Sequence, residues 1–81
     1  MIYTLEMRKA VHSIQKPPGF ACDIIDKDDH IALRVYEDDI HNLSFTQRLK
    51  AMEYLTQVED IVKTFGVQCY SEGAKGARPR I

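Results

Sequence analysis

The strongest pattern of hydrophobic and polar positions in the chain runs from residue 45 to residue 65. Apolar side chains recur there at spacings of three and four, as they do along one face of an α-helix. The positions are Phe45, Leu49, Met52, Leu55, Val58, Val62 and Phe65, and Ala51, Tyr54 and Ile61 widen the face. Ser44 and Gln47 have the spacing of a capping box, and Gly66 stands where a left-handed residue commonly ends a helix. The pattern predicts one long helix that packs against more than one surface.

Residues 3–15 predict a second, shorter helix. Five apolar positions there follow the spacing of a helix face. They are Tyr3, Met7, Ala10, Val11 and Ile14. A strand is the alternative, because Tyr3, Leu5 and Met7 alternate with polar residues, but Lys9 breaks this alternation and most of the stretch consists of strong helix formers. Residues 17–19 are Pro-Pro-Gly and end the helix, since proline lacks an amide donor and disfavours helical angles in the preceding residue.

Residues 20–35 show the alternation of an antiparallel hairpin. The apolar positions are Phe20, Cys22 and Ile24 in the first strand and Ile31, Leu33 and Val35 in the second. Residues 27–29 are a short polar turn between the strands. Residues 38–42 read as a polar connection with Ile40 as its one apolar anchor, and the β-prone residues 67–71 predict a third strand.

Together these elements predict a single small α+β domain over residues 1–72, with the order α-β-β-α-β. An antiparallel hairpin and a third strand would pack on the long helix and the shorter N-terminal helix. Residues 73–81, GAKGARPRI, have three basic residues and little to bury, so they predict a flexible basic tail. A core of this size contributes only about 3–5 kcal/mol of net stability, which favours association into a homodimer through strand edges or through Tyr54 and Ile61.

No apolar run approaches the length needed to span a membrane, and the first residues lack the pattern of a signal peptide. The expectation is therefore a cytoplasmic protein without membrane contact. Cys22 and Cys69 fit that compartment as buried free thiols, because a reducing environment disfavours a disulfide between them.

The net charge is only −1, but the charges are distributed unevenly along the chain. Residues 22–41 sum to −5, whereas residues 1–21 and 66–81 each sum to +2. Seven of the twelve acidic residues lie between positions 20 and 39: Asp23, Asp26, Asp28, Asp29, Glu37, Asp38 and Asp39. The acidic middle and the basic ends are the two candidate interaction surfaces.

Metal and catalytic motifs are incomplete. Asp26, Asp28 and Glu37 match positions 1, 3 and 12 of a calcium loop, but Ile31 stands where that loop requires glycine. The histidines and cysteines lack the spacing of zinc ligands: they are His12, His30, His41, Cys22 and Cys69. No nucleophile elbow, phosphate-binding loop or dinucleotide fingerprint is present. We therefore expect no metal, no cofactor and no enzymatic activity.

The leading functional hypothesis is a non-catalytic protein that binds another protein through an acidic hairpin surface, complementary to a basic groove. The residues of that surface are Asp26, Asp28, Asp29, Glu37, Asp38 and Asp39. Small accessory or inhibitor proteins of phages and mobile elements are often non-catalytic binding proteins of this kind. The alternative is a nucleic-acid-binding module, with Arg8, Lys9, Lys16, Lys75, Arg78 and Arg80 as its phosphate contacts. A small metal-dependent enzyme assembled across an oligomer is a third hypothesis.

Overall fold

The computed structural model describes residues 1–79 and has the predicted α+β architecture. Its elements are helix α1 (Leu5–His12), strands β1 (Cys22–Asp26) and β2 (Ile31–Tyr36), helices α2 (Glu37–His41) and α3 (Phe45–Thr64), and strand β3 (Cys69–Ala74). The predicted order α-β-β-α-β is confirmed, with the short helix α2 as an addition. No helix within the described residues is both long and apolar enough to cross a membrane.

The three strands form one mixed sheet in the order β1-β2-β3. Strands β1 and β2 are antiparallel, with Cys22 opposite Val35 and Asp26 opposite Ile31. Strand β3 lies parallel to β2, and helices α2 and α3 form the crossover connection that parallel pairing requires. Asp28 occupies the left-handed region in the hairpin turn, with a φ of 71°, a conformation that aspartate tolerates better than most residues.

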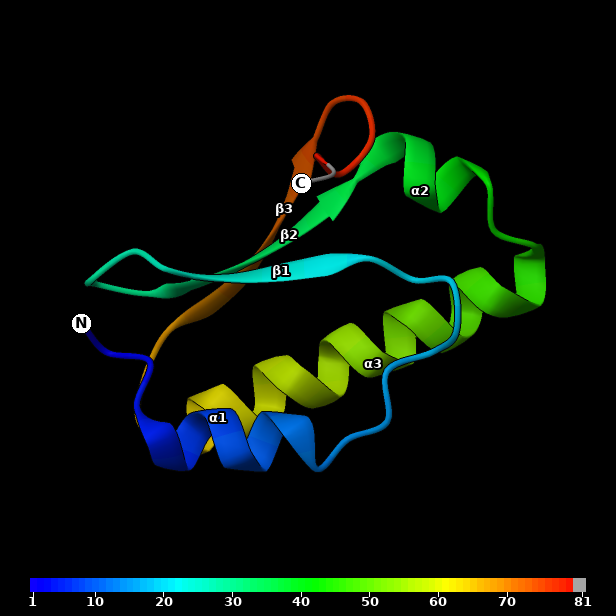
Figure 1. Cartoon of the computed structure of the whole chain (residues 1–81). Helices are drawn as coiled ribbons and strands as arrows, with labels where there is room; N and C mark the ends of the chain where they lie inside the picture. Colours follow the sequence, from blue (N-terminus) through cyan, green and yellow to red (C-terminus); the bar gives the residue numbers. More distant parts are fainter. Residues whose placement is uncertain (80–81) are drawn as a thin grey trace.

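The core lies between the sheet and the helices α1 and α3, which cover the same face (Figure 1). Leu33 at the centre of β2, Val58 and Val62 of α3, and Val11 of α1 are almost completely buried there. Because side chains alternate along a strand, Asp23, Arg34 and Tyr36 belong to the opposite face of the sheet, which no helix of the described chain covers in Figure 1.

The long helix buries only part of the predicted apolar face. Ala51, Tyr54, Val58 and Val62 are buried, whereas Phe45, Leu49, Met52 and Phe65 are exposed. Ala51 and Tyr54 are buried in the same turns that expose Leu49 and Met52, so the exposed side chains lie on the side of α3 that faces away from the core. The first turns of α3 also extend beyond the end of the sheet in Figure 1. Tyr54 is buried and Ile61 is partly buried against the core, so these two side chains offer little exposed surface to the predicted dimer contact, which stays a prediction.

Helix α1 and strand β3 differ from their predicted limits. Thr4 caps α1 by accepting a hydrogen bond from the Met7 amide, so the helix begins at Leu5 and Tyr3 lies outside it. Strand β3 begins two residues later than predicted and includes Gly73 and Ala74, the first two residues of the predicted tail. The last two residues of that tail, 80 and 81, lie outside the described part of the chain.

The capping box at the start of α3 is confirmed. The Ser44 hydroxyl accepts a hydrogen bond from the Gln47 amide at 3.2 Å, and the Gln47 side chain accepts one from the Ser44 amide at 2.8 Å. Ser44→Ala should therefore lower the free energy of unfolding by about 1 kcal/mol in urea titrations, because one helix amide loses its partner. Thr46→Ala, at an exposed neighbour, should change it by less than about 0.5 kcal/mol. Equal effects would mean that the cap contributes no specific stability.

Candidate functional site

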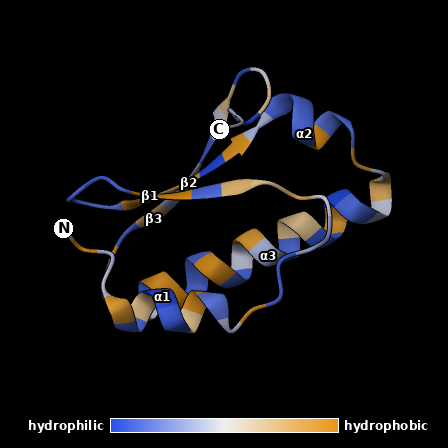
Figure 2. Ribbon diagram, in the orientation of Figure 1, coloured by the Kyte–Doolittle hydropathy of each residue, from blue (hydrophilic) through white to orange (hydrophobic). Residues whose placement is uncertain are grey.

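The acidic residues form two separate groups, at opposite ends of β2. Asp26, Asp28 and Asp29 surround the hairpin turn, and Glu37, Asp38 and Asp39 form the first turn of α2. Six strand residues place these groups about 20 Å apart. Figure 2 shows hydrophilic residues gathered at both places. The structure therefore does not bring the six predicted residues together as one surface.

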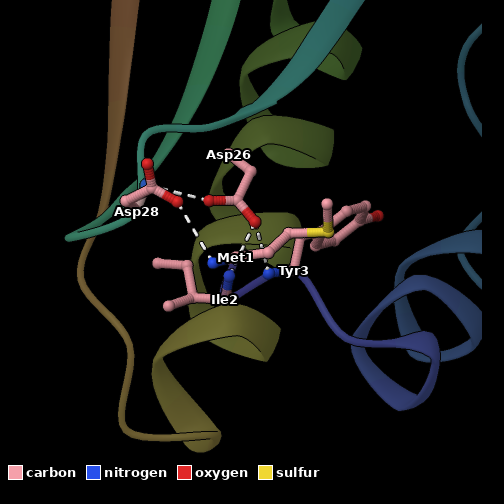
Figure 3. A network of polar contacts seen from close by, with 5 residues as sticks. All are labelled: Met1, Ile2, Tyr3, Asp26 and Asp28. Atoms are coloured by element: carbon pink, nitrogen blue, oxygen red, sulfur yellow. Dashed lines mark hydrogen bonds and ion pairs between the residues drawn. The ribbon is translucent and has the colours of Figure 1, made fainter.

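The carboxylates of the hairpin turn bind the protein's own backbone and N-terminus (Figure 3). Asp26 accepts hydrogen bonds from the amides of Ile2 at 2.7 Å, Tyr3 at 2.8 Å and Asp28 at 2.9 Å. These hydrogen bonds hold the pKa of Asp26 below its ordinary value, and the bond from Tyr3 has the largest effect. The Asp28 carboxylate lies 3.1 Å from the ammonium group of Met1. This group of acids therefore has a structural role in holding residues 1–3 against the hairpin.

Asp29 is also engaged within the turn. Its carboxylate lies 2.6 Å from Nδ1 of His30, and this contact lowers the pKa of Asp29. The His30 ring in turn packs against the ring of Tyr70 on β3, with 5.4 Å between the two ring centres. Two of the three turn carboxylates, Asp28 and Asp29, remain exposed to solvent.

The acids of α2 are less engaged. Glu37 and Asp38 are exposed, and neither forms an ion pair with any group in residues 1–79. The amide of Asp38, which the helix itself leaves without a partner, donates to the carbonyl of Gly76 at 3.1 Å. The Asp39 carboxylate accepts a hydrogen bond from the Arg78 amide at 3.3 Å. Glu37 and Asp38 are thus the carboxylates best placed to meet an outside partner.

A groove of about 350 Å³ lies between α2, α3 and β3, and Glu37 is one of its lining residues. Val35, Ile40 and Leu55 line it with apolar surface, and its other lining residues include Glu37, His41 and Ser71. The carboxylate of Glu72, which also borders the groove, is paired with Arg34 at 3.3 Å. We call this feature the α2 groove. Its composition, apolar with a few charged groups, is that of sites that take up part of a ligand.

The C-terminal segment, residues 75–79, is fixed to the open face of the sheet. Arg78 forms an ion pair with Asp23 at 2.8 Å, and the other oxygen of Asp23 accepts a hydrogen bond from the Tyr36 hydroxyl at 2.8 Å. The hydrogen bond and the charge of Asp23 raise the pKa of Tyr36. The hydrogen bonds from the Asp38 amide to Gly76 and from the Arg78 amide to Asp39 add to this network. Together they anchor a stretch that the sequence predicted to be flexible.

The predicted phosphate contacts are also divided between two places. Arg8 and Lys9 lie on α1 and Lys16 follows it, whereas Lys75 and Arg78 lie on the opposite side of the molecule (Figure 1). Arg78 is already paired with Asp23, and the guanidinium of Arg8 lies 5.5 Å from the centre of the Tyr3 ring. Arg80 lies outside the described residues. The basic residues therefore do not form one patch for a nucleic-acid backbone.

Within residues 1–79, no three histidine, cysteine, aspartate or glutamate side chains are arranged to hold a metal ion. Both cysteines are free thiols. Burial raises the pKa of Cys22 and of Cys69 to about 11, so that each is almost entirely protonated at neutral pH. Such thiols are poor nucleophiles and act as small apolar side chains.

Comparisons of the chain with protein-family models, with curated proteins and with solved structures found no match. Of the surfaces described above, the α2 groove combines the most features of a binding site.

Proposed function

We propose that the protein acts by binding another protein, without catalysis of its own, and that a basic segment of the partner occupies the α2 groove. The observation that supports this proposal is the apolar groove that Glu37 lines, next in sequence to the exposed Asp38; neither carboxylate forms an ion pair within residues 1–79. A segment with one apolar side chain next to lysine or arginine would match both parts of this surface. A cytoplasmic location and a role as an accessory or inhibitor protein belong to the same proposal.

Each part of the groove has a distinct contribution in this proposal. The apolar side chains of Val35, Ile40 and Leu55 would bury the partner's anchor residue, which supplies most of the affinity. Glu37 and Asp38 would attract the basic residues from a distance and speed association, an effect that added salt screens. The negative charges at the start of α2 are also favoured by the helix dipole, so they can be retained there at little cost in stability.

A random-peptide library selected against the protein tests this proposal. The enriched peptides should combine an apolar residue with lysine or arginine. The double variant Glu37→Gln, Asp38→Asn should bind them about ten-fold more weakly, because two exposed charge pairs are lost.

The matched control is Asp28→Asn, Asp29→Asn, which removes the same charge at the other end of β2. Asparagine also tolerates the left-handed conformation of residue 28, so the turn is retained. This control should bind the peptides as the unmodified protein does. Enrichment of acidic peptides, or equal weakening by both double variants, would contradict the assignment to the α2 groove.

A further inference from the structure

A hollow of about 300 Å³ lies between the C-terminal end of α1 and strand β1. Helix α1 packs into the core through Val11 but leaves β1 incompletely covered, since no residue of that strand is fully buried. Cys22 and Ile24 of β1 therefore border the hollow instead of a closed layer. We call this feature the α1 pocket, and its lining residues are Val11, His12, Ile14, Lys16, Cys22, Ile24 and Tyr54.

The charge of the α1 pocket favours an anion. None of its lining residues is a carboxylate, and Lys16 contributes an ammonium group, which can only donate hydrogen bonds. Lys16 is exposed and forms no ion pair within residues 1–79. Burial has the largest effect on the pKa of Cys22, and the charge of Lys16 acts against it, which indicates that the ammonium group lies near that thiol.

The Tyr54 hydroxyl supplies a second donor without a partner. Tyr54 is only 8% exposed, yet its hydroxyl forms no hydrogen bond within residues 1–79, whereas Tyr36 and Tyr70 both donate to side chains. The Tyr3 hydroxyl also lacks a partner, but protein encloses it completely. Burial raises the pKa of Tyr54, so its hydroxyl keeps the proton near neutral pH. The charge of Cys22 adds to this rise, as expected for a hydroxyl on the side of the ring toward β1.

We propose that the α1 pocket binds a small monocarboxylate with an apolar chain. The chain would lie against Val11, Ile14 and Ile24, and the carboxylate would accept hydrogen bonds from the Lys16 ammonium and the Tyr54 hydroxyl. Such charge-assisted hydrogen bonds are stronger than those between neutral groups, and an apolar wall with a few polar groups is typical of a ligand pocket. The α1 pocket shares no lining residue with the α2 groove, so this proposal stands independently of the proposed function.

Titration of the isotope-labelled protein with octanoate, followed by amide and methyl chemical shifts, tests the ligand class. Octanoate should bind with a dissociation constant on the order of 0.1–1 mM, and the largest shifts should occur at Val11, Ile14 and Ile24. Octylammonium has the same chain with the opposite charge, and acetate has the same charge without the chain. Each should bind at least about ten-fold more weakly. Equal binding of octylammonium, no saturable shifts with octanoate, or shifts centred on the α2 groove or on Phe45 and Met52 would overturn the proposal.

Two matched pairs of variants test the two donors. Tyr54→Phe should weaken octanoate binding about five-fold, because it removes one hydroxyl donor, and Tyr70→Phe should leave it unchanged. Lys16→Gln should weaken binding by about five-fold or more, and Lys9→Gln, at an exposed lysine outside the α1 pocket, should not.

The melting temperature of Tyr54→Phe should equal or exceed that of the unmodified protein, because the hydroxyl that it removes has no partner in the fold. A clear loss of stability in this variant would show that the hydroxyl is already satisfied within the protein and would contradict its role as a ligand donor. Unchanged octanoate affinity in both Tyr54→Phe and Lys16→Gln would overturn the assignment of the α1 pocket.

Discussion

Leu33→Ala is expected to leave a large fraction of the protein unfolded at 25 °C, whereas Leu49→Ala should leave it folded. Leu33 lies in the central strand with none of its surface exposed, and removing a leucine side chain from such a place costs about 2–5 kcal/mol. A domain of this length has only about 3–5 kcal/mol of net stability to lose. Leu49 is 45% exposed, so the same substitution there should cost no more than about 0.5 kcal/mol.

Urea titration of both variants measures this contrast. Both variants replace leucine by alanine, so any difference between their stabilities comes from where the residue lies in the fold. Equal losses of stability would mean that the first turns of α3 pack with their predicted apolar face toward the core.

Asp26→Ala is expected to lower the melting temperature by several degrees at pH 7. The substitution removes the acceptor for the amides of Ile2, Tyr3 and Asp28 and so releases the N-terminal residues from the hairpin. Hydrogen exchange at the amides of Ile2 and Tyr3 should accelerate at the same time. Asp60→Ala, at an exposed carboxylate of α3, is the control and should leave both the melting temperature and this exchange unchanged.

The effect of Asp26→Ala should depend on pH. The pKa of Asp26 is lower in the folded protein than the value of about 4 in the unfolded chain, so folding favours the carboxylate form. The stabilisation is therefore complete above about pH 4 and is lost as the pH falls through the lower pKa of the folded state. Melting curves of the two proteins should converge on acidification below pH 4. A gap that stays constant with pH would show that the charge of Asp26 contributes nothing.

The features that the sequence predicted correctly depend on residues close together in the chain. The capping box of Ser44 and Gln47 and the left-handed Gly66 are set by local backbone chemistry. The alternation around Leu33 fixes which face of the hairpin meets the helices, because neighbouring side chains on a strand point in opposite directions. Such signals hold wherever the segment lies in the fold.

The features that the sequence did not predict depend on distant residues. Helix α2 has only five residues, too few for a helical period to be visible, and its Asp38 amide is satisfied by Gly76 near the other end of the chain. The role of Asp26 depends on Ile2 and Tyr3, more than twenty positions away. The exposure of Phe45 and Met52 depends on which side of α3 meets the sheet, and residues outside the helix decide this.

The central claim is that the α2 groove is the binding surface for a basic segment. Amide chemical shifts of the nitrogen-labelled protein, recorded during titration with a peptide selected from the library, test this claim residue by residue. The account predicts that the largest shifts occur in residues 35–41, at Leu55 and in residues 71–73, and that added salt weakens them. Shifts centred on the hairpin turn at residues 27–30, or on α1, would contradict it.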